Sequence, residues 1–95
     1  MKILVTVAAL ATLLLPVMRC AGIGPDGKYE GSGLLTSDLT QHTCNLVSGF
    51  ILEGTFGNQQ CCFLSDIRKG DFNRICNQQK PGSEFPNFKG NVETC

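Results

Sequence analysis

The residues of this sequence whose side chains could take part in chemical reactions are its six cysteines and its single histidine. His42 stands two residues before Cys44, and a cysteine nucleophile needs an imidazole base beside a free thiolate. An oxidising compartment would consume that thiol by forming a disulfide. We therefore predict that Cys44 is a half-cystine, that His42 is a surface residue next to it, and that the chain is not an enzyme and has no catalytic residues.

The first 22 residues predict export. Lys2 supplies a positive charge, residues 3–15 are apolar apart from two threonines, and small residues follow at Cys20-Ala21-Gly22. This is the layout of a secretory signal peptide. The apolar run is shorter than the roughly 20 residues that cross a bilayer, so we expect no transmembrane segment. The small-residue rule places the cut after Gly22 or Cys20, which predicts a signal peptide at 1–22 and a single mature, extracellular domain at 23–95.

Five cysteines would remain after such a cut, and they are the predicted disulfide residues: Cys44, Cys61, Cys62, Cys76 and Cys95. An odd number leaves three alternatives: a free thiol, a disulfide-linked dimer, or a cut that spares Cys20. The neighbours Cys61 and Cys62 are expected to bond to different partners, because a ring between them would be strained. Spacing does not decide the pairing. Our preferred arrangement places Cys44 and Cys95 in separate bridges, each to one of the adjacent pair or to Cys76.

Length and charge narrow the class of protein. A domain of 73 residues has a small core, of order 3–5 kcal/mol in net stability, so disulfides would supply much of the rest. The segment 23–95 carries six basic and eight acidic side chains, which gives a formal charge of −2. It has no basic tract, so we expect neither nucleic acid nor an anionic membrane as its partner.

Four segments predict regular structure. Residues 45–53 and 59–64 are rich in strand-forming side chains and read as a hairpin with a long loop. Gly49 inside the first segment indicates a bulge or a close backbone approach. Residues 71–79 predict a helix with Asp71 as its N-cap, and residues 91–94 predict a final strand. Residues 34–42 could form a helical turn, but we predict no sustained helix there.

These elements predict a small disulfide-rich α+β domain, mainly antiparallel β with one short helix. On the second strand, Cys61 and Cys62 would face opposite sides of the sheet, so one strand could be tied on both faces.

Metal ligands in zinc-site spacing and paired catalytic carboxylates are not recognisable, so we expect no metal and no cofactor. Phe85 and Phe88, in a proline-containing loop, are the candidate binding surface.

The overall plan resembles the small secreted cysteine-rich proteins of filamentous fungi, many of which act as effectors. The resemblance lies in layout: a signal peptide, fewer than 100 residues, scattered half-cystines and no enzyme motif. It implies export to the host apoplast or the host–pathogen interface, a role in virulence, and binding of a host protein or cell-surface component. The alternative is an antimicrobial or toxin-like peptide, which the negative charge disfavours, because membrane-active peptides usually present a cationic face.

Overall fold

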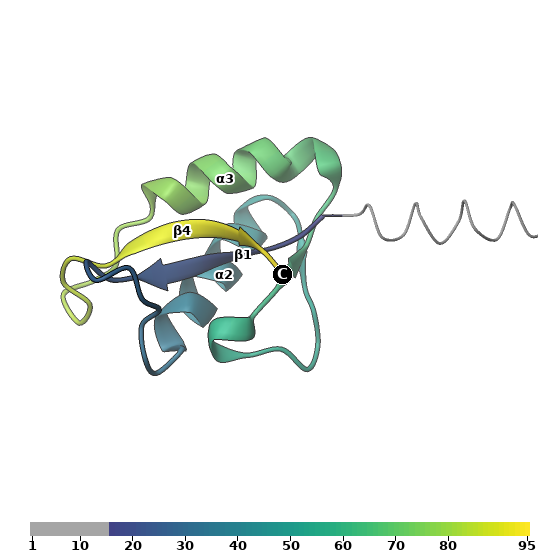
Figure 1. Cartoon of the computed structure of the whole chain (residues 1–95). Coiled ribbons are helices and arrows are strands. Elements are labelled where there is room, and N and C mark those ends of the chain that lie inside the picture. The colour runs from purple at the N-terminus through teal and green to yellow at the C-terminus, as the bar shows by residue number, and fades with distance from the viewer. Residues whose placement is uncertain (1–15) are drawn as a thin grey trace, which may run out of the picture.

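The computed structural model describes residues 16–95, which form a four-stranded sheet and two α-helices (Figure 1). The elements follow one another in the order β1 (Val17–Ile23), α2 (Leu34–Leu46), β2 (Phe50–Ile51), β3 (Cys62–Phe63), α3 (Lys69–Gln78) and β4 (Lys89–Thr94). Two 3₁₀ turns, η1 (Gly57–Gln59) and η2 (Asp66–Arg68), lie in the connections. The predicted class, a small disulfide-rich α+β domain with antiparallel strands, is confirmed.

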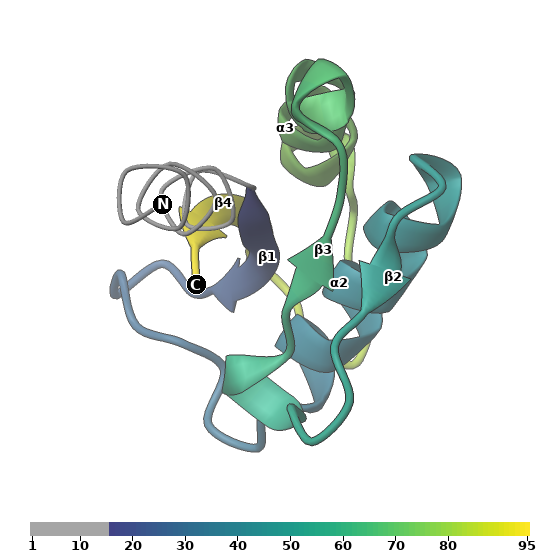
Figure 2. The same cartoon turned by 90° about the vertical axis from the view of Figure 1, so that its right-hand side faces the viewer.

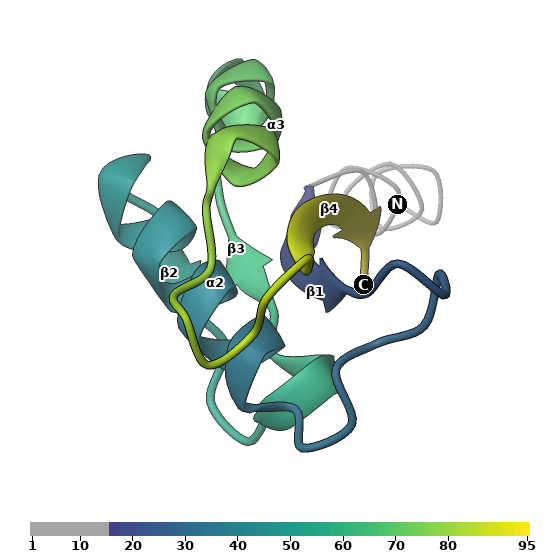
Figure 3. The same ribbon diagram turned by 90° about the vertical axis from the view of Figure 1, so that its left-hand side faces the viewer.

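The sheet has the strand order β2-β3-β1-β4, and every neighbouring pair is antiparallel (Figure 2). Each helix connects two strands that are separated in the sheet by a third strand. This is the β-α-β-β-α-β arrangement known as a split βαβ fold. Both helices lie on the same side of β1 and β4 (Figure 3). The N-terminal strand is therefore in the middle of the sheet, and the last strand lies beside it.

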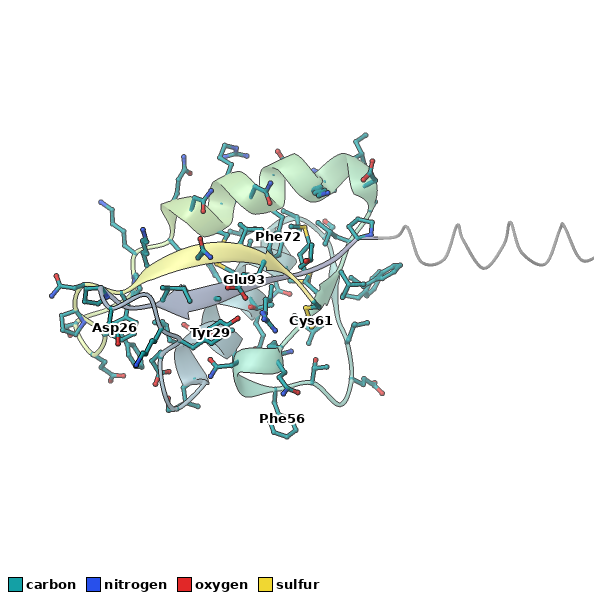
Figure 4. The ribbon with its side chains drawn as sticks, viewed as in Figure 1. Asp26, Tyr29, Phe56, Cys61, Phe72 and Glu93 are labelled. Carbon is teal, nitrogen blue, oxygen red and sulfur yellow. A yellow bond between two sulfur atoms is a disulfide. The ribbon has the colours of Figure 1, made fainter. Side chains whose placement is uncertain are left out.

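One hydrophobic core fills the space between the sheet and the helices. Phe72 on α3 is completely buried, and Figure 4 shows it between that helix and the sheet. On β1, Met18 and Cys20 point into the core at alternate positions, as a strand with one buried face requires. The other buried core residues come from both helices, from β3 and from the residues that directly follow α2 and β3: Leu35, Leu39, Cys44, Val47, Cys62, Leu64 and Cys76.

The predicted close approach at Gly49 is confirmed. A Cβ atom at this position would lie 2.6 Å from the sulfur of Cys62 and 2.9 Å from the sulfur of Cys44. A second close approach occurs at Gly90 on β4, where a Cβ atom would collide with the carbonyl oxygen of Cys76. Both glycines therefore let the backbone pass beside a disulfide.

Helix α2 was missed by the sequence prediction, which expected no sustained helix over residues 34–42 and a strand over 45–53. The helix runs from Leu34 to Leu46, and the strand is reduced to Phe50–Ile51. Half of the six buried residues of α2 are threonines, at Thr36, Thr40 and Thr43. A polar residue type on the core-facing side hides the apolar periodicity by which a helix is recognised.

Two of these threonines, Thr36 and Thr40, bond to the backbone of β1. Strand β3 pairs with β1 only at the first two residues of β1, so the same edge of β1 has no strand partner further along. There the amide of Cys20 donates to Oγ1 of Thr40 at 2.9 Å, and the amide of Gly22 donates to Oγ1 of Thr36 at 2.9 Å. Helix α2 thus supplies the acceptors that buried amide groups need.

Helix α3 and strand β4 confirm the predictions for residues 71–79 and 91–94, with small shifts in their ends. The helix begins at Lys69, so Asp71 lies in its first turn. The prediction that Asp71 is the N-cap was therefore wrong. Its carboxylate lies 3.6 Å from the guanidinium of Arg68 and 3.4 Å from that of Arg74. A negative charge in the first turn still interacts favourably with the helix dipole.

Three disulfides join the elements. Cys20–Cys76 connects β1 to α3, Cys44–Cys62 connects α2 to β3, and Cys61–Cys95 connects the start of β3 to the end of the chain. The predictions that Cys61 and Cys62 bond to different partners, and that Cys44 and Cys95 belong to separate bridges, are confirmed. Because Cys61 and Cys62 point to opposite faces of the sheet, disulfides hold this strand on both faces.

The expected odd cysteine is not present in the structure. Cys20 is the partner of Cys76, and all six cysteines are paired within the chain. A dimer linked through an unpaired cysteine, which was one of the alternatives, is therefore not supported. The predicted cut positions after Cys20 and Gly22 both fall inside β1.

Glu30 performs the capping role at the start of α2. The residue before the helix, Gly33, has a positive φ of 80° and no side chain with which to cap it. Instead, Oε1 of Glu30 accepts hydrogen bonds from the amide of Leu35 at 2.9 Å and from the hydroxyl of Ser32 at 2.7 Å. Burial by itself would raise the pKa of Glu30, but these hydrogen bonds to the charged form outweigh burial and lower its pKa below 4.5.

We expect the replacement Glu30→Gln to lower the free energy of unfolding at neutral pH by about 1–3 kcal/mol, because the hydrogen bonds lose their charged acceptor. The folded-state pKa of Glu30 is depressed, so its contribution is complete above about pH 4.5 and is lost as pH falls through the folded value. Urea unfolding across pH 3–7 (about four units) should show the two proteins converging at low pH. Exposed Glu53→Gln is the control, and an equal loss in both variants would contradict the capping role.

Candidate functional site

A groove lies between α2 and the loop after α3. Its volume is about 800 Å³, which is in the range of small-molecule and peptide sites. One wall is the first two and a half turns of α2, and the other is the segment 79–85. The groove is lined by Leu34, Leu35, Ser37, Asp38, Leu39, Gln41, His42, Gln79, Lys80, Pro81, Gly82, Ser83, Glu84 and Phe85.

One wall of the groove, and the helix that leads into the other, are held by disulfides to the sheet. Helix α2 is tied to β3 through Cys44, and α3 is tied to β1 through Cys76, three residues before the loop begins. The side-chain amide of Gln79 also donates a hydrogen bond of 3.3 Å to Oγ1 of Thr43, which joins the two walls directly. The width of the groove is therefore fixed at the end nearest these contacts.

The two phenylalanines of the predicted binding surface have different positions. Their rings meet edge to face, with centroids 6.1 Å apart, and both are partly buried against the core. Phe85 lines the groove, whereas Phe88 is not among its lining residues and packs beside Gly24. The predicted pair thus contributes one residue to the groove and one residue that supports it.

The rest of the groove combines an apolar floor with charges of both signs. Leu34 is 69% exposed at its edge, while Leu35 and Leu39 are buried below it. Asp38 and Glu84 provide carboxylates, and Lys80 provides an ammonium group on the loop. A surface of this kind offers apolar contact together with several polar anchors, which is the pattern of a specific binding site.

His42 lines the groove, but it does not have a nucleophilic partner. The sulfur of Cys44 is bonded to the sulfur of Cys62, so it is neither a thiol nor a thiolate. The thiol–imidazole chemistry considered for His42 and Cys44 therefore cannot operate in this structure. His42 remains available as a polar contact on the exposed face of α2.

Sequence reasoning found Phe85 but missed the α2 wall of the groove. Leu34, Asp38 and His42 lie within one helical face, so their proximity follows from helical spacing alone. Recognition of the helix would have grouped them. Their proximity to residues 79–85 depends on the packing of α2 against α3 and has no signal in the sequence.

A second cluster of polar side chains lies on the face of the sheet opposite the helices. Arg19 on β1 donates to Oε1 of Glu93 on β4 at 2.9 Å and to the hydroxyl of Tyr29 at 2.8 Å, and Tyr29 also donates to Glu93. Figure 4 shows Tyr29 next to Glu93.

Burial alone would raise the pKa of Glu93, but its hydrogen bonds to Tyr29 and Arg19 lower this pKa. The bond to Glu93 raises the pKa of Tyr29.

This second cluster is satisfied by its own members. The guanidinium of Arg19 also lies over the Tyr29 ring, 5.4 Å from its centroid, so the cation and the aromatic face are already paired. We interpret the cluster as a structural link between β1, β4 and the loop that carries Tyr29. The groove is therefore the stronger candidate for binding a partner.

Residues 16–95 contain no group of three or more histidine, cysteine or acidic side chains placed to hold a metal ion. Within the same residues, neither helix has the length and apolar character needed to cross a membrane.

No protein-family model, curated protein or solved structure matches this chain. The split βαβ arrangement supports many unrelated activities, so topology by itself indicates no function. A functional proposal must therefore depend on the groove, the disulfides and the charge of the surface.

Proposed function

We propose that this chain is a secreted, non-enzymatic, cysteine-rich protein of the effector type, which binds a host protein or cell-surface component at the host–pathogen interface. The groove between α2 and residues 79–85 is the observation that carries the proposal. It combines apolar and charged side chains in one concavity, and it contains Phe85 from the predicted binding surface. The three disulfides agree with an oxidising extracellular compartment.

The binding mechanism would be pre-organisation. The helix that forms one wall is bonded to the sheet, and the other wall begins three residues after a second disulfide, so a ligand would lose less entropy in ordering the groove. Each side chain or loop that is already fixed reduces the entropy lost in the complex. Apolar contact with Leu34 and Phe85 would provide affinity, and Asp38, Lys80 and Glu84 would select a partner of complementary charge.

Site-specific photo-crosslinking would test this proposal. A photoreactive amino acid is placed at Gln41 in the groove and, as a control, at exposed Asn77 on α3 outside it. Each protein is added to plant apoplastic fluid and to isolated plant cell walls, and crosslinked products are identified by mass spectrometry. We expect a discrete product from position 41 alone. Equal products from both positions, or none from position 41, would contradict the groove as the binding site.

A matched pair of surface substitutions measures the contribution of the groove. Leu34→Asp places a charge on its exposed apolar edge, and Ile67→Asp makes the same change at a residue that is 85% exposed and outside it. We expect Leu34→Asp to weaken binding of the crosslinked partner by about tenfold or more, since burial of a leucine contributes roughly 1.5–3 kcal/mol. Surface plasmon resonance measures the change. Ile67→Asp should bind like the unmodified protein, and an equal effect of both changes would count against the groove.

A further inference from the structure

Strand β1 is the most connected strand of this fold, although the sequence pattern assigns it to a leader that is removed. It lies between β3 and β4, and six consecutive residues, Met18 to Ile23, pair with β4. Strand β4 has no other strand beside it. Removal of β1 would leave β4 without a partner and would separate it from β3.

The buried polar groups of α2 also require β1. Thr36 and Thr40 are completely buried, and their hydroxyl groups accept hydrogen bonds from the amides of Gly22 and Cys20. Thr40 in turn donates to the carbonyl oxygen of Cys20 at 3.2 Å. Two threonines spaced four residues apart on a core-facing helix surface are unusual unless each has a polar partner, and β1 is that partner.

Covalent and ionic contacts lead to the same conclusion. Cys20 and Cys76 are both completely buried, and each is the other's disulfide partner. Without Cys20, the thiol of Cys76 would be left in the core and the number of cysteines would be odd. Arg19, the residue before Cys20, is the cation that pairs with the partly buried carboxylate of Glu93.

We infer that β1, including Cys20, belongs to the folded protein and that any cut that removes the leader falls before Val17. The inference builds on the export proposed above. It moves the processing site away from the small residues at positions 20–22. Any cut before Val17 would retain the whole of β1.

The first test identifies the N-terminus and the disulfides of the secreted protein. The full chain is expressed in a secreting eukaryotic host, and the protein recovered from the medium is sequenced from its N-terminus. It is then digested without reduction for mass spectrometry. We expect an N-terminus before Val17 and a peptide containing Cys20 linked to one containing Cys76. An N-terminus at Ala21 or Ile23 would overturn the inference.

Thiol counts in three proteins provide an independent test that needs no correctly folded variant. If β1 is retained, the denatured, unreduced parent protein has no free thiol, whereas Cys20→Ser and Cys76→Ser each have one. If the cut follows Cys20 or Gly22, the parent and Cys20→Ser give the same mature product with one free thiol, and Cys76→Ser has none. Serine is also small, so the substitution at position 20 does not remove the small-residue signal.

The same experiment separates this inference from the proposal of export. Protein that remains inside the cells would contradict secretion, and its disulfide map would still show whether Cys20 is joined to Cys76. A secreted product without Cys20 would leave the proposed function intact and would overturn the inference about β1.

Discussion

Replacement of Cys20 and Cys76 together by alanine is expected to lower the free energy of unfolding by about 4 kcal/mol. The two cysteines are separated by 56 positions in the sequence, the longest separation among the three disulfides. A cross-link that closes a longer loop removes more conformational freedom from the unfolded chain, and the chain-entropy relation gives about 4 kcal/mol for a loop of this length. A small domain has little stability in reserve, so most of the protein should be unfolded or molten at 37 °C (roughly physiological temperature).

The matched control is the double replacement of Cys44 and Cys62 by alanine. These residues are also completely buried, but they are only 18 positions apart, so the same relation gives about 3 kcal/mol. Both variants and the parent protein are compared by urea unfolding, monitored by circular dichroism. A larger loss in the control than in the Cys20 and Cys76 variant would contradict this ranking. An unchanged stability would show that β1 is not part of the folded protein.

Phe72→Ala is expected to lower the free energy of unfolding by about 3–5 kcal/mol, because it removes the largest fully buried side chain and leaves a cavity. The ring lies in the core between α3 and the sheet (Figure 4). Thermal unfolding should show a fall in Tm of well over 10 °C, on the order of several degrees for each kcal/mol in a domain of this size.

Phe56→Ala is the control for this change, because the same atoms are removed from a side chain that is 79% exposed. Figure 4 shows Phe56 pointing away from the rest of the molecule. Its replacement should change the free energy of unfolding by no more than about 0.5 kcal/mol. Comparable losses in both variants would mean that Phe72 is not a core residue.

The parts of the fold that were predicted correctly depend on local signals. The helix at 71–79 combines an acidic residue near its start, an apolar stripe and a Pro-Gly stop, and α3 follows this pattern closely. The adjacent cysteines on one strand predicted bridges on two faces, because side chains alternate along a strand. Cys44–Cys62 and Cys61–Cys95 confirm that reasoning.

The candidate site was predicted only in part. Phe85 was selected because it is an aromatic residue in a proline-containing loop, and it does line the groove. The opposite wall was missed together with α2, whose buried threonines gave the sequence a polar appearance. A threonine on a core-facing surface is explained only by its hydrogen-bond partner, and that partner is in a strand many residues away.

The sequence by itself determined the class of molecule: a short, cysteine-rich α+β chain that needs disulfides, because a core of this size supplies little stability. Only the tertiary structure decided which cysteines pair, which segment occupies the centre of the sheet, and where a groove forms. Those features depend on contacts between residues far apart in the chain. Small residues next to an apolar run occur both at the end of a leader and in a buried central strand. For residues 17–23, the two interpretations differ only in the contacts with β3, β4 and Cys76, which the sequence does not show.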